Sequence, residues 1–182
     1  MLVVTSAGTL LSSGYAGTGF FSIPDSEVTA DINSRNFSAL AAAFTSIVSD
    51  NFVQGGTALA GTAVPGFYAT GNTSFDPTPY IGKTIYTFIT NGTSLSAANA
   101  TQFALLSFSG KLPVAADPAT PPPTSYNVYA GDGTIAFGKT GPVTHSDVAG
   151  GDFSTIQLQT VPEPSVALLG LLGVAGLVRR RR

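Results

Sequence analysis

The chain is a succession of short apolar segments, rich in β-branched and aromatic residues, that are separated by Gly, Pro, Asn and Asp. This pattern is typical of β-strands joined by turns. The last segment alternates like a half-buried strand, because Ile156 and Leu158 fall on one face and Gln157 on the other. Asn91-Gly92 and Asp132-Gly133 predict hairpin turns, the first of type I′. The predicted strands are 15–21, 66–70, 84–90, 103–109, 126–130, 134–138 and 153–160.

One segment follows helical spacing instead, and Asn36 precedes it in the position of an N-cap. Its apolar residues are Phe37, Leu40, Ala41, Phe44, Ile47 and Val48. A second, shorter helix is predicted over 96–102, and the Pro-rich segment 111–125 predicts a loop between strands. Many short strands with one clear helix predict a mainly β domain over residues 1–160. We expect an antiparallel β-sandwich, for which a jelly roll is one form.

Residues 161–182 differ from the rest of the chain. Residues 166–178 carry no charge and are apolar on every side, whereas a helix in a soluble core usually keeps a polar face. As a helix they would be about 20 Å long, and a bilayer core of about 30 Å can thin to accept so short a span. We therefore predict one transmembrane helix, with a buried C-terminal helix as the alternative. Its large apolar residues are Val166, Leu168, Leu169, Leu171, Leu172, Val174, Leu177 and Val178.

The positive charge at the end of the chain predicts the orientation of this helix. The basic residues are Arg179, Arg180, Arg181 and Arg182. Positive charge stays in the cytoplasm, so the residues before Val161 are expected outside the inner membrane. We therefore predict transient anchoring in the inner membrane and a mature domain that is periplasmic, at the cell surface or extracellular.

The order of these features is itself informative. The triplet Pro162, Glu163 and Pro164, the apolar stretch and the basic end together closely resemble the PEP-CTERM domain of Gram-negative bacteria. Members of that family are exported and processed by membrane proteases called exosortases. The resemblance implies that an exosortase recognises the triplet and cleaves close by. The family is also associated with exopolysaccharide, which is therefore a possible partner of the mature domain.

Two further features bear on export. Proteins with a PEP-CTERM tail normally begin with a signal peptide, but no Lys or Arg precedes Arg35 here, so we expect the leader to be missing from this start. The body is also similar to an exported domain of unassigned activity that is often fused to such tails. The similarity lies in residues 9–11, 17–21, 82–86 and 92–95.

Composition favours a non-catalytic exported protein. The chain has no cysteine, so it has neither a disulfide framework nor a thiolate metal site. Four cations precede the terminal arginines, against ten carboxylates, which gives residues 1–178 a net charge of −6. An acidic surface argues against a nucleic-acid partner. The four cations are Arg35, Lys83, Lys111 and Lys139.

The polar clusters of the body do not predict a reaction. His145 is the only histidine, and with Asp147 and Asp152 it offers too few partners for a metal site or a catalytic triad. The three carboxylates of residues 25–31 are interpreted as a solvated loop, with calcium binding as a minor alternative. We predict no catalytic residue, no metal and no cofactor.

The sequence thus predicts a non-enzymatic exported protein with a structural or adhesive role at the cell surface or in an exopolysaccharide matrix. The alternative is a carbohydrate-binding β-sandwich, which requires exposed aromatic residues in a row on one sheet face. The tyrosines in question are Tyr80, Tyr86, Tyr126 and Tyr129. An enzyme ranks third, because no set of residues predicts a catalytic centre.

Overall fold

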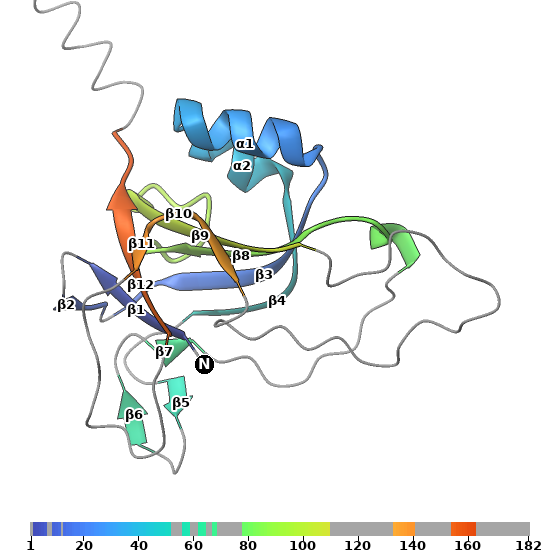
Figure 1. Ribbon diagram of the computed structural model, residues 1–182. Helices are drawn as coiled ribbons and strands as arrows, with labels where there is room; N and C mark the ends of the chain where they lie inside the picture. Colours follow the sequence, from blue (N-terminus) through green and yellow to red (C-terminus); the bar gives the residue numbers. More distant parts are fainter. Residues whose placement is uncertain are drawn as a thin grey trace, which may run out of the picture.

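The structure is a computed structural model, and most of the domain is a single β-sheet with two helices on one of its faces (Figure 1). The described residues are 2–6, 9–11, 13–51, 56–58, 62–64, 67–68, 78–109, 133–140 and 154–162. The main sheet has ten strands, of which seven follow the order β2-β1-β12-β9-β8-β3-β4. These seven are β1 (Leu2–Ser6), β2 (Thr9–Leu10), β3 (Tyr15–Phe21), β4 (Phe44–Asn51), β8 (Ile85–Thr90), β9 (Gln102–Phe108) and β12 (Ser154–Thr160).

Three short strands complete the sheet. β10 (Thr134–Phe137) pairs with β9, β11 (Lys139–Thr140) pairs with β12, and β7 (Phe67–Tyr68) pairs with β1. Two further strands, β5 (Gly56–Ala58) and β6 (Thr62–Val64), form a separate two-stranded sheet. A single 3-10 turn, η2 (Thr78–Tyr80), precedes β8.

The strand alternation predicted from the sequence places apolar side chains on both faces of the sheet. In β8, Ile85 and Ile89 belong to one core cluster, while Tyr86 and Phe88 belong to the other. The helix-side core comprises Phe21, Val28, Phe37, Leu40, Tyr86, Phe88, Phe103, Leu105 and Val161. The far-side core comprises Ala16, Phe20, Ile85, Ile89, Ala104, Leu106, Phe108, Ile156 and Leu158.

Both helices contribute to the helix-side core. α1 (Asp25–Ser34) buries Val28, and α2 (Phe37–Ala43) buries Phe37 and Leu40. Arg35 ends α1 in the left-handed conformation with φ 58°, and the N–H of Asn36 bonds back to the carbonyl oxygen of Asp31 at 2.8 Å. This is the hydrogen bonding of a helix C-terminal cap, and it turns the chain directly into α2.

The predicted helix is wrong in its second half. It was expected to continue through Phe44, Ile47 and Val48, but α2 ends at Ala43 and these residues lie in β4. β4 pairs along its whole length with β3, from Phe44 opposite Phe21 to Asn51 opposite Tyr15. Residues 44–48 fit helical spacing but also include β-branched residues, which favour a strand. Their pairing with β3 selects the strand over the helix.

Two other local predictions are wrong. No helix forms over 96–102, because Gln102 is the first residue of β9. Asn91-Gly92 is not a two-residue hairpin turn, since the whole of residues 91–101 connects β8 to β9. The Asn91 side chain explains this, because its Oδ1 accepts hydrogen bonds from the N–H groups of Thr101 at 3.0 Å and Gln102 at 2.9 Å. The Asn91 side chain thereby joins the two ends of the 91–101 loop.

The sheet itself follows the prediction in part. The domain is mainly β and its sheet is antiparallel, except that β1 and β12 run parallel. The layer packed on the helix-side core is a helix pair and not the second sheet expected for a sandwich. Strands predicted at 15–21, 66–70, 84–90, 103–109, 134–138 and 153–160 have counterparts. The strand at 126–130 and the loop at 111–125 lie outside the described residues.

Candidate functional site

The C-terminal segment leaves the domain at a well-defined point. Val161 is only 8% exposed in the helix-side core, and its N–H donates a hydrogen bond of 2.9 Å to the carbonyl oxygen of Thr101. Pro162, the next residue, is exposed. The predicted sorting triplet therefore begins immediately after the last core residue.

The other predicted site residues of the tail lie outside the described part of the chain. These are Glu163, Pro164, the apolar residues between 166 and 178, and the four terminal arginines. In the described part of the structure, no helix is long and apolar enough to cross a membrane.

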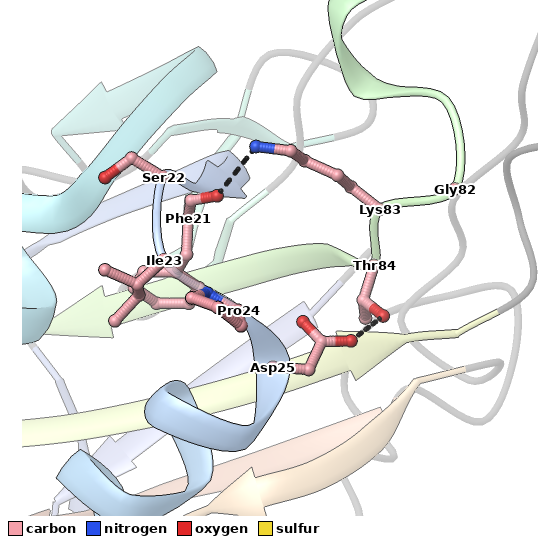
Figure 2. Close-up of a pocket in the computed structure, with 8 residues that line it drawn as sticks. All are labelled: Phe21, Ser22, Ile23, Pro24, Asp25, Gly82, Lys83 and Thr84. Atoms are coloured by element: carbon pink, nitrogen blue, oxygen red, sulfur yellow. Dashed lines mark hydrogen bonds between the residues drawn. The ribbon is translucent and has the colours of Figure 1, made fainter.

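A second polar site lies where α1 begins, over the end of β3. A shallow hollow of about 340 Å³ is lined by Phe21, Ser22, Ile23, Pro24, Asp25, Gly82, Lys83 and Thr84 (Figure 2). Asp25 is the first residue of α1, where a negative charge complements the helix dipole. Its Oδ2 accepts a hydrogen bond of 2.6 Å from the Thr84 hydroxyl. On the rim, Lys83 Nζ donates to the carbonyl oxygen of Phe21 at 3.4 Å.

The other oxygen of Asp25 is also occupied. Its Oδ1 accepts a hydrogen bond of 2.9 Å from the hydroxyl of Tyr86, which is only 6% exposed. Burial raises the pKa of Tyr86 well above its usual range, and the hydrogen bond to Asp25 and the negative charge of that carboxylate raise it further. Tyr86 is therefore a neutral hydrogen-bond donor and cannot act as a base at ordinary pH.

These contacts indicate that Asp25 has a structural role. Both carboxylate oxygens of Asp25 are engaged with groups of the β8 segment, so the carboxylate fastens the start of α1 to the sheet. The prediction that residues 25–31 form a solvated loop is wrong about the loop, because they lie in α1, but Asp25 and Glu27 are exposed as predicted. Within the described ranges, no cluster of three His, Asp or Glu side chains could hold a metal ion.

Comparison with protein families adds one finding about the tail. The PGF-CTERM motif matches residues 163–181. The chain therefore carries a C-terminal sorting signal. A signal of this kind implies anchoring in a membrane followed by export to the cell surface. It also implies a processing enzyme as partner.

Two other comparisons, with curated proteins and with solved structures, found no match for this chain. The match to the sorting signal begins one residue after Pro162, so it covers the tail alone.

The tyrosines proposed for carbohydrate binding do not form a row in the described structure. Tyr80 stacks on Phe20 at 4.0 Å between ring centroids and packs against the far-side core. Tyr86 belongs to the helix-side core. Tyr126 and Tyr129, and the cluster around His145, lie outside the described residues.

The burial of Val161 was not predicted from the sequence. In β12, Ile156 and Leu158 face the far-side core, and Val161 belongs to the opposite face. The available signal was an apolar residue placed out of phase with the strand directly before the Pro162-Glu163-Pro164 triplet. That signal was not sufficient, because a single apolar residue at this position is equally compatible with a linker between the strand and the triplet.

Proposed function

We propose that this protein is a non-enzymatic, exported surface or matrix protein whose tail is read as a PEP-CTERM signal by an exosortase. The observation that supports the sorting part of the proposal is the match of the PGF-CTERM motif, a related sorting signal, to residues 163–181. The chain's own triplet at 162–164 reads Pro-Glu-Pro, which favours the PEP-CTERM variant and makes an exosortase the processing enzyme. Exopolysaccharide is the proposed environment of the mature domain, where its role is structural or adhesive.

The character of the domain supports a role without catalysis. The carboxylate with the most contacts near the hollow, Asp25, has both oxygens bonded within the protein. The nearest buried titratable group, Tyr86, keeps its proton because its pKa is raised. The two residues thus stabilise the fold, and neither is placed to act as a nucleophile or a general base at ordinary pH.

Substitution of Glu163 tests the processing step. Glu163→Gln keeps the size of the side chain and removes its charge, so membrane insertion should continue while release of the mature domain stops. Loss of a charged contact in a protease groove commonly costs several kcal/mol. Glu27→Gln is the matched control, because Glu27 is the only other glutamate and is exposed on α1. Pulse-chase labelling in a host with its exosortase measures release, and normal release of Glu163→Gln would refute the proposal.

Cysteine labelling tests the orientation. The chain has no cysteine, so a single introduced one is a unique probe. Ser26→Cys, at an exposed position of α1, should react with a membrane-impermeant maleimide in intact spheroplasts. Arg182→Cys should react only after the membrane is permeabilised. The reverse pattern would place the domain in the cytoplasm and exclude the proposed route.

A further inference from the structure

β12 has a paired strand on each side, and its last two residues pair with β9. Leu158 pairs with Ser6 of β1, whereas Gln159 and Thr160 pair with Phe103 and Gln102 of β9. β12 is therefore an interior strand of the sheet, and its last residues cannot leave it without breaking contacts to a neighbour. Val161 extends this hold by one residue through its bond to Thr101.

A side-chain contact joins the two strands that flank β12. The hydroxyl of Ser6, in β1, donates a hydrogen bond of 2.6 Å to Oε1 of Gln102, in β9. Because β12 lies between these strands in the sheet, the bond brackets the end of β12. The hold on Thr160 and Val161 thus involves backbone pairing, burial and a side-chain bridge.

The pairing of Thr160 and the burial of Val161 make the residues before the sorting triplet inaccessible to a processing enzyme. A protease binds its substrate as an accessible, extended peptide, and backbone groups already bonded within a sheet are not available to it. No spacer separates the core from the sorting triplet, since Val161 is buried and Pro162 is exposed. Any enzyme that needs substrate residues before Pro162 must therefore wait for the end of β12 to open.

We propose that the folded domain gates the processing of its own sorting signal through Val161. The inference rests on the proposed function, because it assumes an enzyme that reads the triplet. Val161 acts as a positioning residue: it sets how much of the chain before Pro162 the enzyme can reach. The rate of processing then follows the population in which the end of β12 is detached, as proteolysis of a locally opened state does.

A reversible lock tests the gate directly. Gln102 and Thr160 are opposite each other in the β9–β12 ladder, and opposed positions of antiparallel strands lie within the range that a disulfide spans. Since the chain has no cysteine of its own, Gln102→Cys with Thr160→Cys introduces a single possible bridge. Processing of the oxidised full-length precursor should be at least about tenfold slower than that of the reduced form, because detachment must precede cleavage. Reduction should restore the rate in the same molecule.

Two releasing variants test the gate in the opposite direction. Val161→Gly removes the buried side chain and should increase the open population about tenfold to a hundredfold, with processing rising accordingly. A spacer of about six Gly and Ser residues between Val161 and Pro162, about 13 Å in root-mean-square length, should accelerate processing while leaving the core intact. The same spacer inserted between Ala98 and Asn99, in the loop before β9, is the control and should not accelerate it.

The outcomes separate the gate from the proposed function. Equal processing of the oxidised and reduced lock, or no acceleration by the spacer before Pro162, would overturn the gate even when Glu163→Gln stops release. Normal release of Glu163→Gln would instead overturn the reading of the triplet and the gate with it. The melting temperature of each variant shows whether the domain remains folded. If Val161→Gly unfolds the domain, the spacer variant alone tests whether release of the chain before Pro162 accelerates processing.

Discussion

The hydroxyl of Tyr86 donates a hydrogen bond of 2.9 Å to Oδ1 of Asp25, which joins the interior strand β8 to the first residue of α1. The two residues are far apart in the sequence, and Thr84 reinforces the contact through the other carboxylate oxygen. The pair therefore fixes the position of α1 over the sheet at its N-terminal end.

Removal of this contact should loosen α1. Tyr86→Phe is expected to lower the free energy of unfolding by about 1–2 kcal/mol, because it removes one hydrogen bond to a charged group and keeps the ring. Asp25→Ala should cost more, because it also removes the hydrogen bond from the Thr84 hydroxyl. The double variant should cost clearly less than the sum, which urea unfolding of all the variants would establish. Additive losses would show that the two residues act independently.

The same pair predicts a dependence on alkaline pH. The pKa of Tyr86 is raised in the folded protein, so this group contributes stability that is complete below its unfolded pKa of about 10 and declines as the pH rises above that value. Tyr86→Phe should flatten the decline above about pH 10 relative to the parent protein. Urea unfolding at a series of pH values measures the difference, and identical slopes would contradict the prediction.

Gly19 should tolerate no side chain. A Cβ on Gly19 would collide with the backbone carbonyl oxygen of Thr45, at the bulge between β3 and β4. Gly19→Ala is therefore expected to cost about 3 kcal/mol of stability. Gly17→Ala is the matched control in the same strand and should cost less, because the nearest atom is the Ser46 hydroxyl oxygen, which can rotate away. Thermal unfolding distinguishes the two variants.

Phe37 should be the most important residue of α2. Its ring lies 4.8 Å from Phe103 and 4.5 Å from Phe137 between centroids, so one side chain connects α2 to β9 and β10. Phe37→Ala should destabilise the domain by about 3–5 kcal/mol. Ser38→Ala, at the exposed neighbouring position, should change stability by no more than about 0.5 kcal/mol. A comparable loss in both variants would contradict the proposed role of the aromatic packing of Phe37, because both substitutions raise helix propensity.

Asn91 should control the loop that holds Thr101. Asn91→Ala leaves the N–H groups of Thr101 and Gln102 without their acceptor, and should cost about 1–3 kcal/mol. Asn91→Asp keeps the acceptor oxygen and should cost less. Hydrogen exchange should show faster exchange at Val161 in Asn91→Ala, since the amide of Val161 bonds to the carbonyl oxygen of Thr101. An unchanged exchange rate at the Val161 amide would show that the loop of residues 91–101 does not affect the hold on Val161.

The sequence predicted half of the described strands, namely β3, β7, β8, β9, β10 and β12, because their apolar residues alternate or crowd between clear turn signals. It did not predict α1, whose residues include one buried side chain, Val28, and therefore show little helical periodicity. It extended α2 too far, because residues 44–48 satisfy both spacings and only the partner strand β3 decides between them. Prediction from local sequence pattern is least accurate where pairing with a distant strand determines the secondary structure.

The candidate sites show the same division. The sorting signal could be predicted because its features are consecutive in the chain, and a motif match to residues 163–181 agrees with it in kind. The network of Asp25, Thr84 and Tyr86 could not, because it joins segments that are distant in the sequence. The hold on Val161 depends on Thr101, which nothing in the local sequence connects to it.

The parallel pairing of β1 with β12 gives the export of this protein a definite order. Leu2 pairs with Ser154 and Ser6 with Leu158, so β1 finds this partner only after the residues between Ser6 and Ser154 have followed it. Closing so long a loop is slow, and until then β1 has its antiparallel partners β2 and β7 but lacks its parallel partner β12. A chain delivered from its N-terminus thus completes its sheet only when β12 has emerged, which is when the sorting signal reaches the membrane.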